Sequence, residues 1–574
     1  MGWNLLHAAG FARGWVSPAR LYGMTLIAVP IMVEDLEGAL RSAVLAGERG
    51  ADVVEYRVDR VADDTDLVCT LVDRSPLPCL LTCRPVWEGG DYDGDDQSRI
   101  SLIEAAGLVP RPPVYIDIEL LAYERSANLR QKVHLVVEHE KQHRPVDTGL
   151  VLSSHDFEGR PADLIRRIGA MVAAPACRVA KVAWRARSIR DNLEAFDLLA
   201  ETPKPLIALC MGEFGLSSRV LAKKFGAHLT FASLDKRSGT APGQPTIEEI
   251  KGLYRWDRVG PETRVFGVIG YPVGHSLSPA IHNAGFDAID PDLSTPASGS
   301  GTVDYGFDGV YLPLPVAPGY EPFKASIGAW IDHPTLHFRG GSVTIPHKEN
   351  LLRFVEERGG EIEALAQRIG AANTLTVRED GSLLASNTDY AAALDVLCEG
   401  LETTAEGLAG MRIAVIGAGG VARALVAGFA YAGATVAIYN RTRERAEALA
   451  EAFHGTETMQ GGRAKVVAGP MEKLCGSCFE AVVNCTSVGM HPEVDASPVP
   501  VSLFEDETCP RLVFDTIYNP RKTKLLREAE AAGCRIVSGD EMFVRQAAGQ
   551  FELWTGQPAP LGVFRQVLDR SLAD

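Results

Sequence analysis

The chain has 574 residues and a formal net charge of −17, with 57 basic and 74 acidic side chains. This length exceeds what one hydrophobic core supports and predicts two to four domains. The acidic balance argues against nucleic acid or an anionic membrane as a partner, because both attract a basic face. No apolar run approaches the ~20 residues that a membrane-spanning helix requires. We therefore expect a soluble, cytoplasmic protein.

Eleven cysteines are scattered along the chain without the dense spacing of a secreted disulfide scaffold, so we expect a reducing compartment. The closest pair, Cys475 and Cys478 in "CGSC", has neither a second pair nor a histidine cluster nearby. Zinc sites need such additional ligands. No metal is predicted.

Residues 1–23 contain Arg13 and Arg20 and no acidic side chain, a composition similar to that of an organelle transit peptide. The simpler interpretation, which we adopt, is an N-terminal extension before a fold that begins at Met24.

Eight β-branched runs alternate with amphipathic stretches in the first half of the chain, a pattern typical of parallel β-α units. The runs are residues 26–31, 52–59, 79–84, 114–120, 149–156, 178–184, 205–212 and 228–235. Eight such units in just over 200 residues have the size of a (β/α)8 barrel, which we place at residues 24–256. An open doubly wound sheet is the alternative.

A barrel of this kind carries its functional groups at the carboxyl ends of the strands. The ionisable residues there are Glu55, Arg57, Arg84, Asp117, Glu119, His155 and Lys181, with Arg219 after the seventh run. Lys181 lies in "RVAKVAW", where Val179, Lys181 and Ala183 share the inward face of a strand.

One lysine among arginines indicates imine chemistry. A lysine beside other cations in a dry site loses its proton more readily, and the neutral amine attacks a carbonyl to form a Schiff base. His155, one strand away, would remove a proton next to the imine carbon. The arginines would hold a carboxylate, so the residue types predict a carbonyl-bearing carboxylic acid as substrate.

Six motifs, "VVEYRVD", "TCR...EGG", "VLSSHDF", "AKVA", "GLSSR" and "TAPGQ", resemble type I 3-dehydroquinate dehydratases in order and spacing. The resemblance implies that Lys181 forms the imine with 3-dehydroquinate, and that His155 abstracts the adjacent proton and helps to expel water. It also implies that Arg219 faces the substrate carboxylate and that Thr240 replaces the serine usual in bacterial members. The implied substrate-binding residues are Glu55, Arg57, Arg84, Glu88, Arg219, Thr240 and Gln244.

The pattern resets near "DRVGPETR", residues 257–264, where Gly260 and Pro261 interrupt the helical run and a new strand begins at Val265. We interpret this segment as a linker. The domains expected after it are a substrate-binding domain at 265–395, a Rossmann domain at 396–540 and C-terminal helices at 541–574 that return to the substrate-binding domain.

A dinucleotide-binding signature opens the expected Rossmann domain. The strand 412–416 leads into a G-x-G-x-x-A turn formed by Gly417, Gly419 and Ala422, followed by a helix and a second strand ending at Tyr439. The glycines allow a pyrophosphate to approach the helix N-terminus, whose dipole favours negative charge.

The residues after the second strand indicate NADP. An NAD enzyme usually has an acid there, whereas this chain has Asn440, Arg441 and Thr442, with Arg445 one turn later. An acid would repel a 2'-phosphate, and a guanidinium binds it with two hydrogen bonds.

Residues 265–395 contain "GYPVGHSLSPAIHN", "GGSVTIPHKEN", "IGAANTL" and "SNTDY", rich in hydroxyls and amides that suit a polyhydroxylated ligand and not a metal. Lys348 and Asp389 would form an acid–base pair, because reduction of a ketone needs a proton at its oxygen.

These motifs, with "NCTSVGM", "DTIYNPRKTKLL" and "RQAAGQFELWTG", resemble shikimate dehydrogenases over residues 265–574. Ser342 replaces the Asn common in "GxNVTxPxK", which puts a supporting hydrogen bond in doubt, and Tyr390 stands where Gly is commoner outside fused enzymes. With Lys348 and Asp389 as the catalytic pair, the resemblance implies a substrate site formed by Ser276, Ser278, Thr344, Asn373, Tyr518 and Gln546. It implies an NADP site formed by Gly417, Ala418, Gly419, Gly420, Ala422, Asn440, Arg441, Thr442, Arg445, Thr486, Ser487 and Gly539.

Together the two resemblances imply a bifunctional enzyme of the shikimate pathway whose domain order is the order of the reactions. Its small-molecule partners would be 3-dehydroquinate, 3-dehydroshikimate, shikimate and NADP(H). One alternative is a second half that oxidises quinate with NAD, against which Arg441, Ser276 and Ser278 argue. Another is a non-catalytic regulator that senses these metabolites, which would be free to lose the four catalytic candidates. All four are present: Lys181, His155, Lys348 and Asp389.

Overall fold

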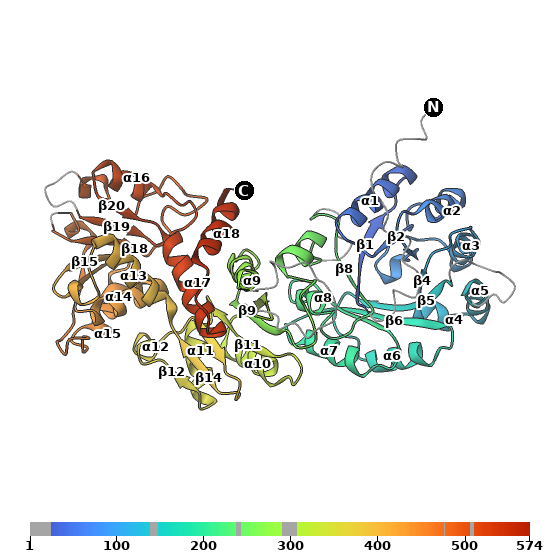
Figure 1. Cartoon of the computed structure of the whole chain (residues 1–574), viewed down its shortest axis with the longest axis horizontal. Helices are drawn as coiled ribbons and strands as arrows, with labels where there is room; N and C mark the ends of the chain where they lie inside the picture. The colour runs from blue at the N-terminus through green and yellow to red at the C-terminus, as the bar shows by residue number, and fades with distance from the viewer. Residues whose placement is uncertain are drawn as a thin grey trace. The chain divides into compact units, whose positions relative to one another are not determined.

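The computed structural model describes residues 24–137, 147–236, 243–289, 307–475, 477–504 and 510–573, and the chain divides into two compact units (Figure 1). The first unit comprises residues 1–263 with 332–335, and the second residues 264–331 with 336–574. The division after Thr263 falls within the segment assigned to a linker. Among the described helices, none is both long and apolar enough to cross a membrane.

Eight parallel strands form the sheet of the first unit in the order β7-β6-β5-β4-β3-β2-β1-β8. They are β1 Leu26–Met32, β2 Val53–Arg57, β3 Cys79–Thr82, β4 Tyr115–Glu119, β5 Gly149–Asp156, β6 Cys177–Arg185, β7 Leu206–Met211 and β8 Leu229–Phe231. β1 pairs with both β2 and β8, and the His228 amide donates to the Leu206 carbonyl at 2.9 Å, so β8 also meets β7. The (β/α)8 barrel is confirmed. The doubly wound alternative, which reverses its strand order at a switch point, is excluded.

Helices lie around the outside of this sheet (Figure 1). They are α1 Leu36–Glu48, α2 Thr65–Arg74, α3 Asp96–Ala106, α4 Leu120–Arg125, α5 Ala127–Val137, α6 Leu164–Ala173, α7 Asp191–Glu201 and α8 Leu216–Val220, with the single turns η2 Val86–Glu88 and η3 Glu249–Leu253. Asp35, Asp64 and Asp95 cap α1, α2 and α3, because each carboxylate accepts a hydrogen bond from the amide three residues later.

Alternate strand residues fill the barrel interior, among them Ala28, Leu80, Val151 and Val179, all buried. Lys181 follows Val179 by two residues on β6 and therefore points inward as well. The period of the strand thus places the lysine side chain inside the barrel, at the middle of β6.

Two six-stranded sheets form the second unit, ordered β10-β9-β11-β13-β14-β12 and β17-β16-β15-β18-β19-β20. The first contains β9 Arg264–Gly270, β10 Gly309–Pro315, β11 Phe338–Val343, β12 Glu361–Ile362, β13 Thr374–Val377 and β14 Leu383–Ser386. The second, parallel throughout as in a Rossmann fold, contains β15 Arg412–Ile416, β16 Thr435–Tyr439, β17 Lys465–Gly469, β18 Ala481–Asn484, β19 Leu512–Asp515 and β20 Arg535–Val537.

Ten α-helices of the described residues accompany these sheets. They are α9 Ser278–Ala288, α10 Tyr320–Asp332, α11 Lys348–Glu357, α12 Ala364–Ile369, α13 Thr388–Leu401, α14 Gly420–Tyr431, α15 Arg443–Phe453, α16 Lys524–Ala531, α17 Gly539–Thr555 and α18 Leu561–Ala573. α13 and α17 run through residues 395 and 540, where the sequence divides domains, so continuous helices join the two sheets. The single turns η5 Glu406–Leu408, η6 Met471–Lys473 and η7 Val501–Phe504 lie in connecting segments.

The C-terminal helix α17 is attached to the first of these sheets by its buried face. Trp554 donates from Nε1 to the Leu375 carbonyl at 3.0 Å, and Phe551 lies with its ring 5.6 Å from those of Phe286 and Phe564. The aromatic cluster therefore joins α17 and α18 to α9.

Replacing Phe551 with Ala should destabilise the second unit by about 3–5 kcal/mol, because the fully buried ring leaves a cavity between α17, α9 and α18. The measurement is denaturant-dependent amide exchange of peptides from β9 and α17. Leu553→Ala on the exposed side of the same helix is the control and should cost under about 1 kcal/mol. Equal effects of the two variants would contradict the packing described here.

Candidate active sites

One cavity at the carboxyl ends of the barrel strands gathers the predicted residues of the first site. Its lining includes Glu55, Arg57, Arg84, Glu88, His155, Lys181, Arg219 and Gln244. The prediction for Thr240 lies outside the described residues.

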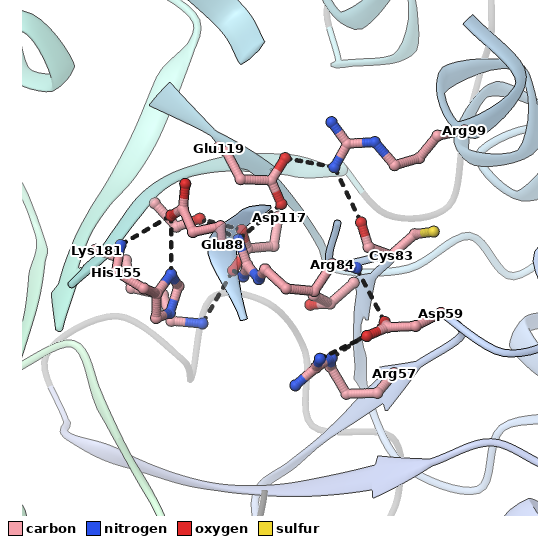
Figure 2. A network of polar contacts seen from close by, with 12 residues as sticks. Arg57, Asp59, Cys83, Arg84, Glu88, Arg99, Asp117, Glu119, His155 and Lys181 are labelled. Carbon is pink, nitrogen blue, oxygen red and sulfur yellow. Dashed lines mark hydrogen bonds and ion pairs between the residues drawn. The ribbon is translucent and has the colours of Figure 1, made fainter. Parts of the chain in front are cut away.

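Lys181 is buried, and it forms ion pairs with two acidic residues of other barrel strands, Asp117 and Glu55. Nζ lies 3.0 Å from Oδ2 of Asp117 (Figure 2). It also lies 3.7 Å from Oε1 of Glu55 and 4.7 Å from the centre of the Phe231 ring. The sequence predicted a lysine among arginines, and the cavity contains Arg57, Arg84 and Arg219 together with Lys181. Arg84 lies one carboxylate away, with Nη2 2.8 Å from the same Asp117 oxygen.

Asp117 therefore connects the lysine to the nearest arginine. Burial alone would raise the pKa of Asp117, but Arg84 and Lys181 outweigh it and hold the pKa below its ordinary value. Ser153 adds a hydrogen bond from its Oγ to Oδ1 at 2.5 Å. The sequence placed Asp117 at a strand end without giving it a role in the site. The alternation in "YIDIE", which turns two acids toward the interior, is the signal that could have found it.

His155 is held by Glu88. Oε1 of Glu88 accepts from the His155 amide at 2.8 Å and lies 3.0 Å from Nδ1. Burial, reinforced by Arg84 and Lys181, lowers the pKa of His155 well below its ordinary value, and burial raises the pKa of Glu88 to about 8. The imidazole is therefore neutral near pH 7. In the tautomer whose Nδ1 carries the proton and donates to Glu88, the Nε2 lone pair can accept a proton.

Arg219 is a buried cation that no carboxylate of the described residues joins in an ion pair. Burial lowers the pKa of Arg219 to about 10, and its Nε has no hydrogen-bond partner within that part of the chain. An uncompensated buried charge costs several kcal/mol. A ligand carboxylate in this cavity would remove that cost.

In the second unit, Lys348 and Asp389 form the predicted pair, with Nζ 2.6 Å from Oδ2. Lys348 is the first residue of α11, and Asp389 the second of α13. Oδ1 of Asn387 accepts from the Asp389 amide at 3.1 Å and caps α13. The Lys348 side chain is 21% exposed, whereas Asp389 is buried, so the lysine is the more accessible member of the pair.

The other predicted substrate residues lie in three groups around this unit. Asn373 adjoins the pair, because its Oδ1 accepts from the Thr388 amide at 2.9 Å. Ser276 and Ser278 follow β9, with the Ser278 amide donating to Oγ of Ser276 at 3.3 Å. Thr344 follows β11, the parallel neighbour of β9.

Tyr518 and Gln546 form the third group through Phe543. The Tyr518 ring stacks on Phe543 at 5.1 Å, and Nε2 of Gln546 donates to the Phe543 carbonyl at 3.1 Å. Within the described ranges no hydrogen bond or ion pair links Ser276, Ser278 or Thr344 to Lys348 or Asp389.

Ser342 makes the supporting contacts that its departure from the family pattern had put in doubt. Tyr311 donates to its Oγ at 2.6 Å, and that Oγ donates to Oε1 of Gln550 at 2.7 Å. Gln550 in turn donates to the Asn373 carbonyl at 3.3 Å. The sequence missed Gln550, which lies one helical turn after Gln546 on α17 and so shares its side of the helix.

The predicted dinucleotide turn has the geometry of a phosphate cradle. Gly417 has φ +112°, which a side chain rarely tolerates, and a Cβ there would lie 3.1 Å from the Cys485 carbonyl oxygen. Gly419 is the N-cap of α14 and, having no side chain, leaves the amides of Gly420 and its successors uncapped. Ala418 is half-buried and Ala422 buried, as a close helix–strand contact requires.

The residues after β16 present basic side chains to solvent. Asn440 donates from Nδ2 to the Thr442 carbonyl at 2.7 Å and stiffens the turn into α15. Arg441 and Arg445 are exposed and form no ion pair with any described residue, whereas Arg443 pairs with Glu447 at 2.7 Å.

Two further predicted cofactor segments flank the glycine turn. The amide and hydroxyl of Thr486 both donate to Oδ1 of Asn484, while the next residue, Ser487, is exposed. Gly539 begins α17, and a Cβ there would lie 2.3 Å from the Thr516 carbonyl oxygen. Each predicted residue of the second unit thus lies in a described segment.

No cluster of three or more metal-ligating side chains occurs in the described ranges. Cys475 and Cys478 are both free thiols.

Family sequence profiles match four segments of the chain. Residues 27–261 match type I 3-dehydroquinase, and residues 268–375 match the shikimate dehydrogenase substrate-binding domain. Residues 400–468 match shikimate/quinate 5-dehydrogenase, and residues 540–568 match the shikimate 5'-dehydrogenase C-terminal domain.

Known proteins resemble either the whole chain or its second half. The shikimate dehydrogenase (NADP(+)) of Methanosarcina mazei is 38% identical over 311 residues, 54% of this chain and 99% of that protein. The Thermus thermophilus shikimate 5-dehydrogenase, crystallised with NADP(H) and shikimate, is 32% identical with a TM-score of 0.42, covering 54% of this chain and 100% of that one. The chloroplastic bifunctional 3-dehydroquinate dehydratase/shikimate dehydrogenase of Arabidopsis thaliana is 36% identical over 560 residues, 95% of this chain and 84% of that protein. The chain therefore belongs to the family of bifunctional 3-dehydroquinate dehydratase/shikimate dehydrogenases.

Proposed function

We propose that the barrel dehydrates 3-dehydroquinate to 3-dehydroshikimate through an imine on Lys181, and that the second unit reduces this product to shikimate with NADPH. The observation that carries the first half is the cavity in which a buried lysine, a neutral histidine and an arginine without a carboxylate partner converge. The Lys348–Asp389 pair supports the second half.

Dehydration needs an amine, a base and an anion-binding group, and the cavity offers one of each. Arg219 binds the substrate carboxylate while the Lys181 amine attacks the ketone carbon and the ketone oxygen leaves as water. His155 takes a proton from the carbon next to the imine. It then returns this proton to the departing hydroxyl group, which leaves as a second water. Hydrolysis of the imine releases 3-dehydroshikimate and restores Lys181.

The second unit fits a bound NADPH, because the Gly417 turn and the uncapped start of α14 suit a pyrophosphate and Arg441 suits a 2'-phosphate. When bound, NADPH supplies the hydride. Lys348 donates a proton to the substrate carbonyl oxygen, and Asp389 holds the lysine in place. We assign residues 265–395 to substrate binding and 396–540 to the cofactor, with 541–574 returning to the former.

The expected location of the protein is the cytoplasm. The Arabidopsis relative is described as chloroplastic, so residues 1–23 are the segment whose fusion to a reporter would test this location.

Borohydride reduction in the presence of 3-dehydroquinate should label Lys181, because an imine is reduced to a stable secondary amine. Peptide mass mapping locates the label. Lys181→Met should abolish both the label and dehydration while shikimate oxidation stays within about twofold of wild type. A label on another lysine would refute the assignment.

Lys348→Ala should lower kcat for shikimate oxidation by about 10²–10⁴-fold, because the proton donor to the carbonyl oxygen is lost. Steady-state assays of both reactions measure the effect, and dehydration should be unchanged. The matched control, Lys324→Ala, removes an exposed lysine that pairs with Glu357 on the same unit and should change neither rate. Parallel loss of both activities in Lys348→Ala would contradict two independent sites.

Arg441→Ser should raise KM for NADP+ by about tenfold or more and leave KM for NAD+ nearly unchanged, because only NADP+ carries the 2'-phosphate. Arg443→Ser, which removes an arginine already paired with Glu447, is the control. The same assays with quinate in place of shikimate test the quinate alternative, and a clear preference for quinate with NAD+ would overturn the proposed reaction.

A further inference from the structure

Two charged residues behind the barrel cavity extend its ion network into the barrel wall. Arg99 of α3 and Glu119 of β4 are both fully buried, and neither lines the cavity. Nη1 of Arg99 contacts Oε2 of Glu119 and donates to the Cys83 carbonyl at 3.0 Å (Figure 2). Nη2 of Arg99 lies 2.8 Å from Oδ1 of Asp96. Arg99 and Glu119 would therefore not contact a ligand bound in the cavity.

Glu119 divides its two oxygens between two arginines. Oε2 contacts Arg99, and Oε1 accepts from Nη1 of Arg84 at 2.7 Å. The other side of the Arg84 guanidinium reaches Asp117, whose Oδ2 is the atom nearest the Lys181 ammonium. A continuous series of contacts therefore runs from Arg99 through Glu119, Arg84 and Asp117 to Lys181.

Stability alone does not account for a charge in this position. A buried ion pair is often no more stabilising than apolar side chains of the same volume. The neighbours Ile100, Leu102 and Ile103 show that α3 buries apolar side chains against the same barrel. Arg99 in addition keeps a buried Nε without a hydrogen-bond partner in the described ranges, an uncompensated cost.

The fork shape of a guanidinium makes the position of Arg84 sensitive to both of its carboxylate partners. With Arg99 in place, one oxygen of Glu119 is occupied and only the other is offered to Arg84. Without Arg99, both oxygens become available, and Arg84 gains a bidentate partner by moving toward Glu119 and away from Asp117. Of the two cations, only Lys181 would then pair with Asp117, and the ion pair between them would become stronger. The lysine must break this ion pair before its amine can attack a ketone.

We propose that Arg99 and Glu119 are positioning residues for the dehydration, which hold Arg84 where it shares Asp117 with Lys181. The inference rests on the proposed imine chemistry. It concerns the rate at which the imine forms more than the affinity for substrate: Arg84 also lines the cavity, but so do Arg219 and Gln244, which are not part of the series of contacts from Arg99 to Lys181.

Arg99→Met should therefore lower kcat for dehydration by about ten- to a hundredfold while KM changes by less than about threefold. Single-turnover borohydride trapping should show imine formation slowed in the same proportion, with the label still on Lys181. Arg99→Lys, which restores a charge without the fork, should recover part of the rate. The control is Arg160→Met, which breaks an exposed pair with Glu194 elsewhere on the barrel and should leave kcat unchanged.

A double-mutant cycle tests whether the pair acts as a unit. If Arg99 works through Glu119, Arg99→Met combined with Glu119→Gln should be no slower than the slower single variant. Independent, multiplying losses would overturn the inference. So would an Arg99→Met protein, folded by circular dichroism, whose kcat stays within about twofold of wild type.

The outcomes separate this inference from the proposed function. Absence of a trapped imine in the wild-type chain would overturn the imine chemistry itself. A wild-type imine with unchanged kinetics in Arg99→Met would overturn only the positioning role. If Arg99→Met does not fold, Arg99→Lys decides: a kcat equal to wild type overturns the inference, and a slowed imine step at constant KM supports it.

Discussion

The pairing of buried charges is the constraint on which the barrel site depends. A cation isolated in the barrel interior costs several kcal/mol. Except for Arg219, the cations described at this site each have a carboxylate within reach. Some of these pairs join different elements, because Asp117 of β4 contacts both Lys181 of β6 and Arg84, which follows β3. The paired cations are Arg57, Arg84, Arg99 and Lys181, and their partners are Asp59, Glu55, Asp117 and Glu119.

The second unit positions its reactive pair by backbone geometry instead. Lys348 and Asp389 each stand in the first turn of a helix, so helix starts and caps determine where they lie. Asn387 caps one of these helices, and Asn373 connects the first turn of that helix to the start of β13. The partly exposed Lys348 loses less hydration than a fully buried cation would, and Asp389 is its ion-pair partner among the described residues.

Strand periodicity was enough to predict the barrel, because inward and outward faces alternate and helices intervene eight times. The predicted run 178–184 lies within β6, Cys177–Arg185. The last run was too long: β8 spans only Leu229–Phe231, because the Ser233 amide turns away to the Pro245 carbonyl. Local β propensity does not predict this early end of β8, because it depends on a contact with a residue twelve positions later.

Residue types and motif order predicted a set of side chains for each site, but not how those side chains are paired. Lys181 and Asp117 are 64 residues apart, and only the closed barrel brings them to 3.0 Å. The same holds for Gln550, which reaches Ser342 across 208 residues. A charged residue in a buried strand indicates that it needs an ion-pair partner. Which residue becomes that partner depends on the tertiary structure.

Both reaction centres lie on one polypeptide, each built from residues of its own compact unit. Every molecule synthesised therefore carries one of each, and the cell cannot alter their ratio through transcription or separate degradation. Any imbalance between the two steps has to be corrected by turnover number or substrate saturation. The slower of the two sites therefore determines how much of the whole chain the cell must make. A mutation that speeds up that site lowers the amount of protein required.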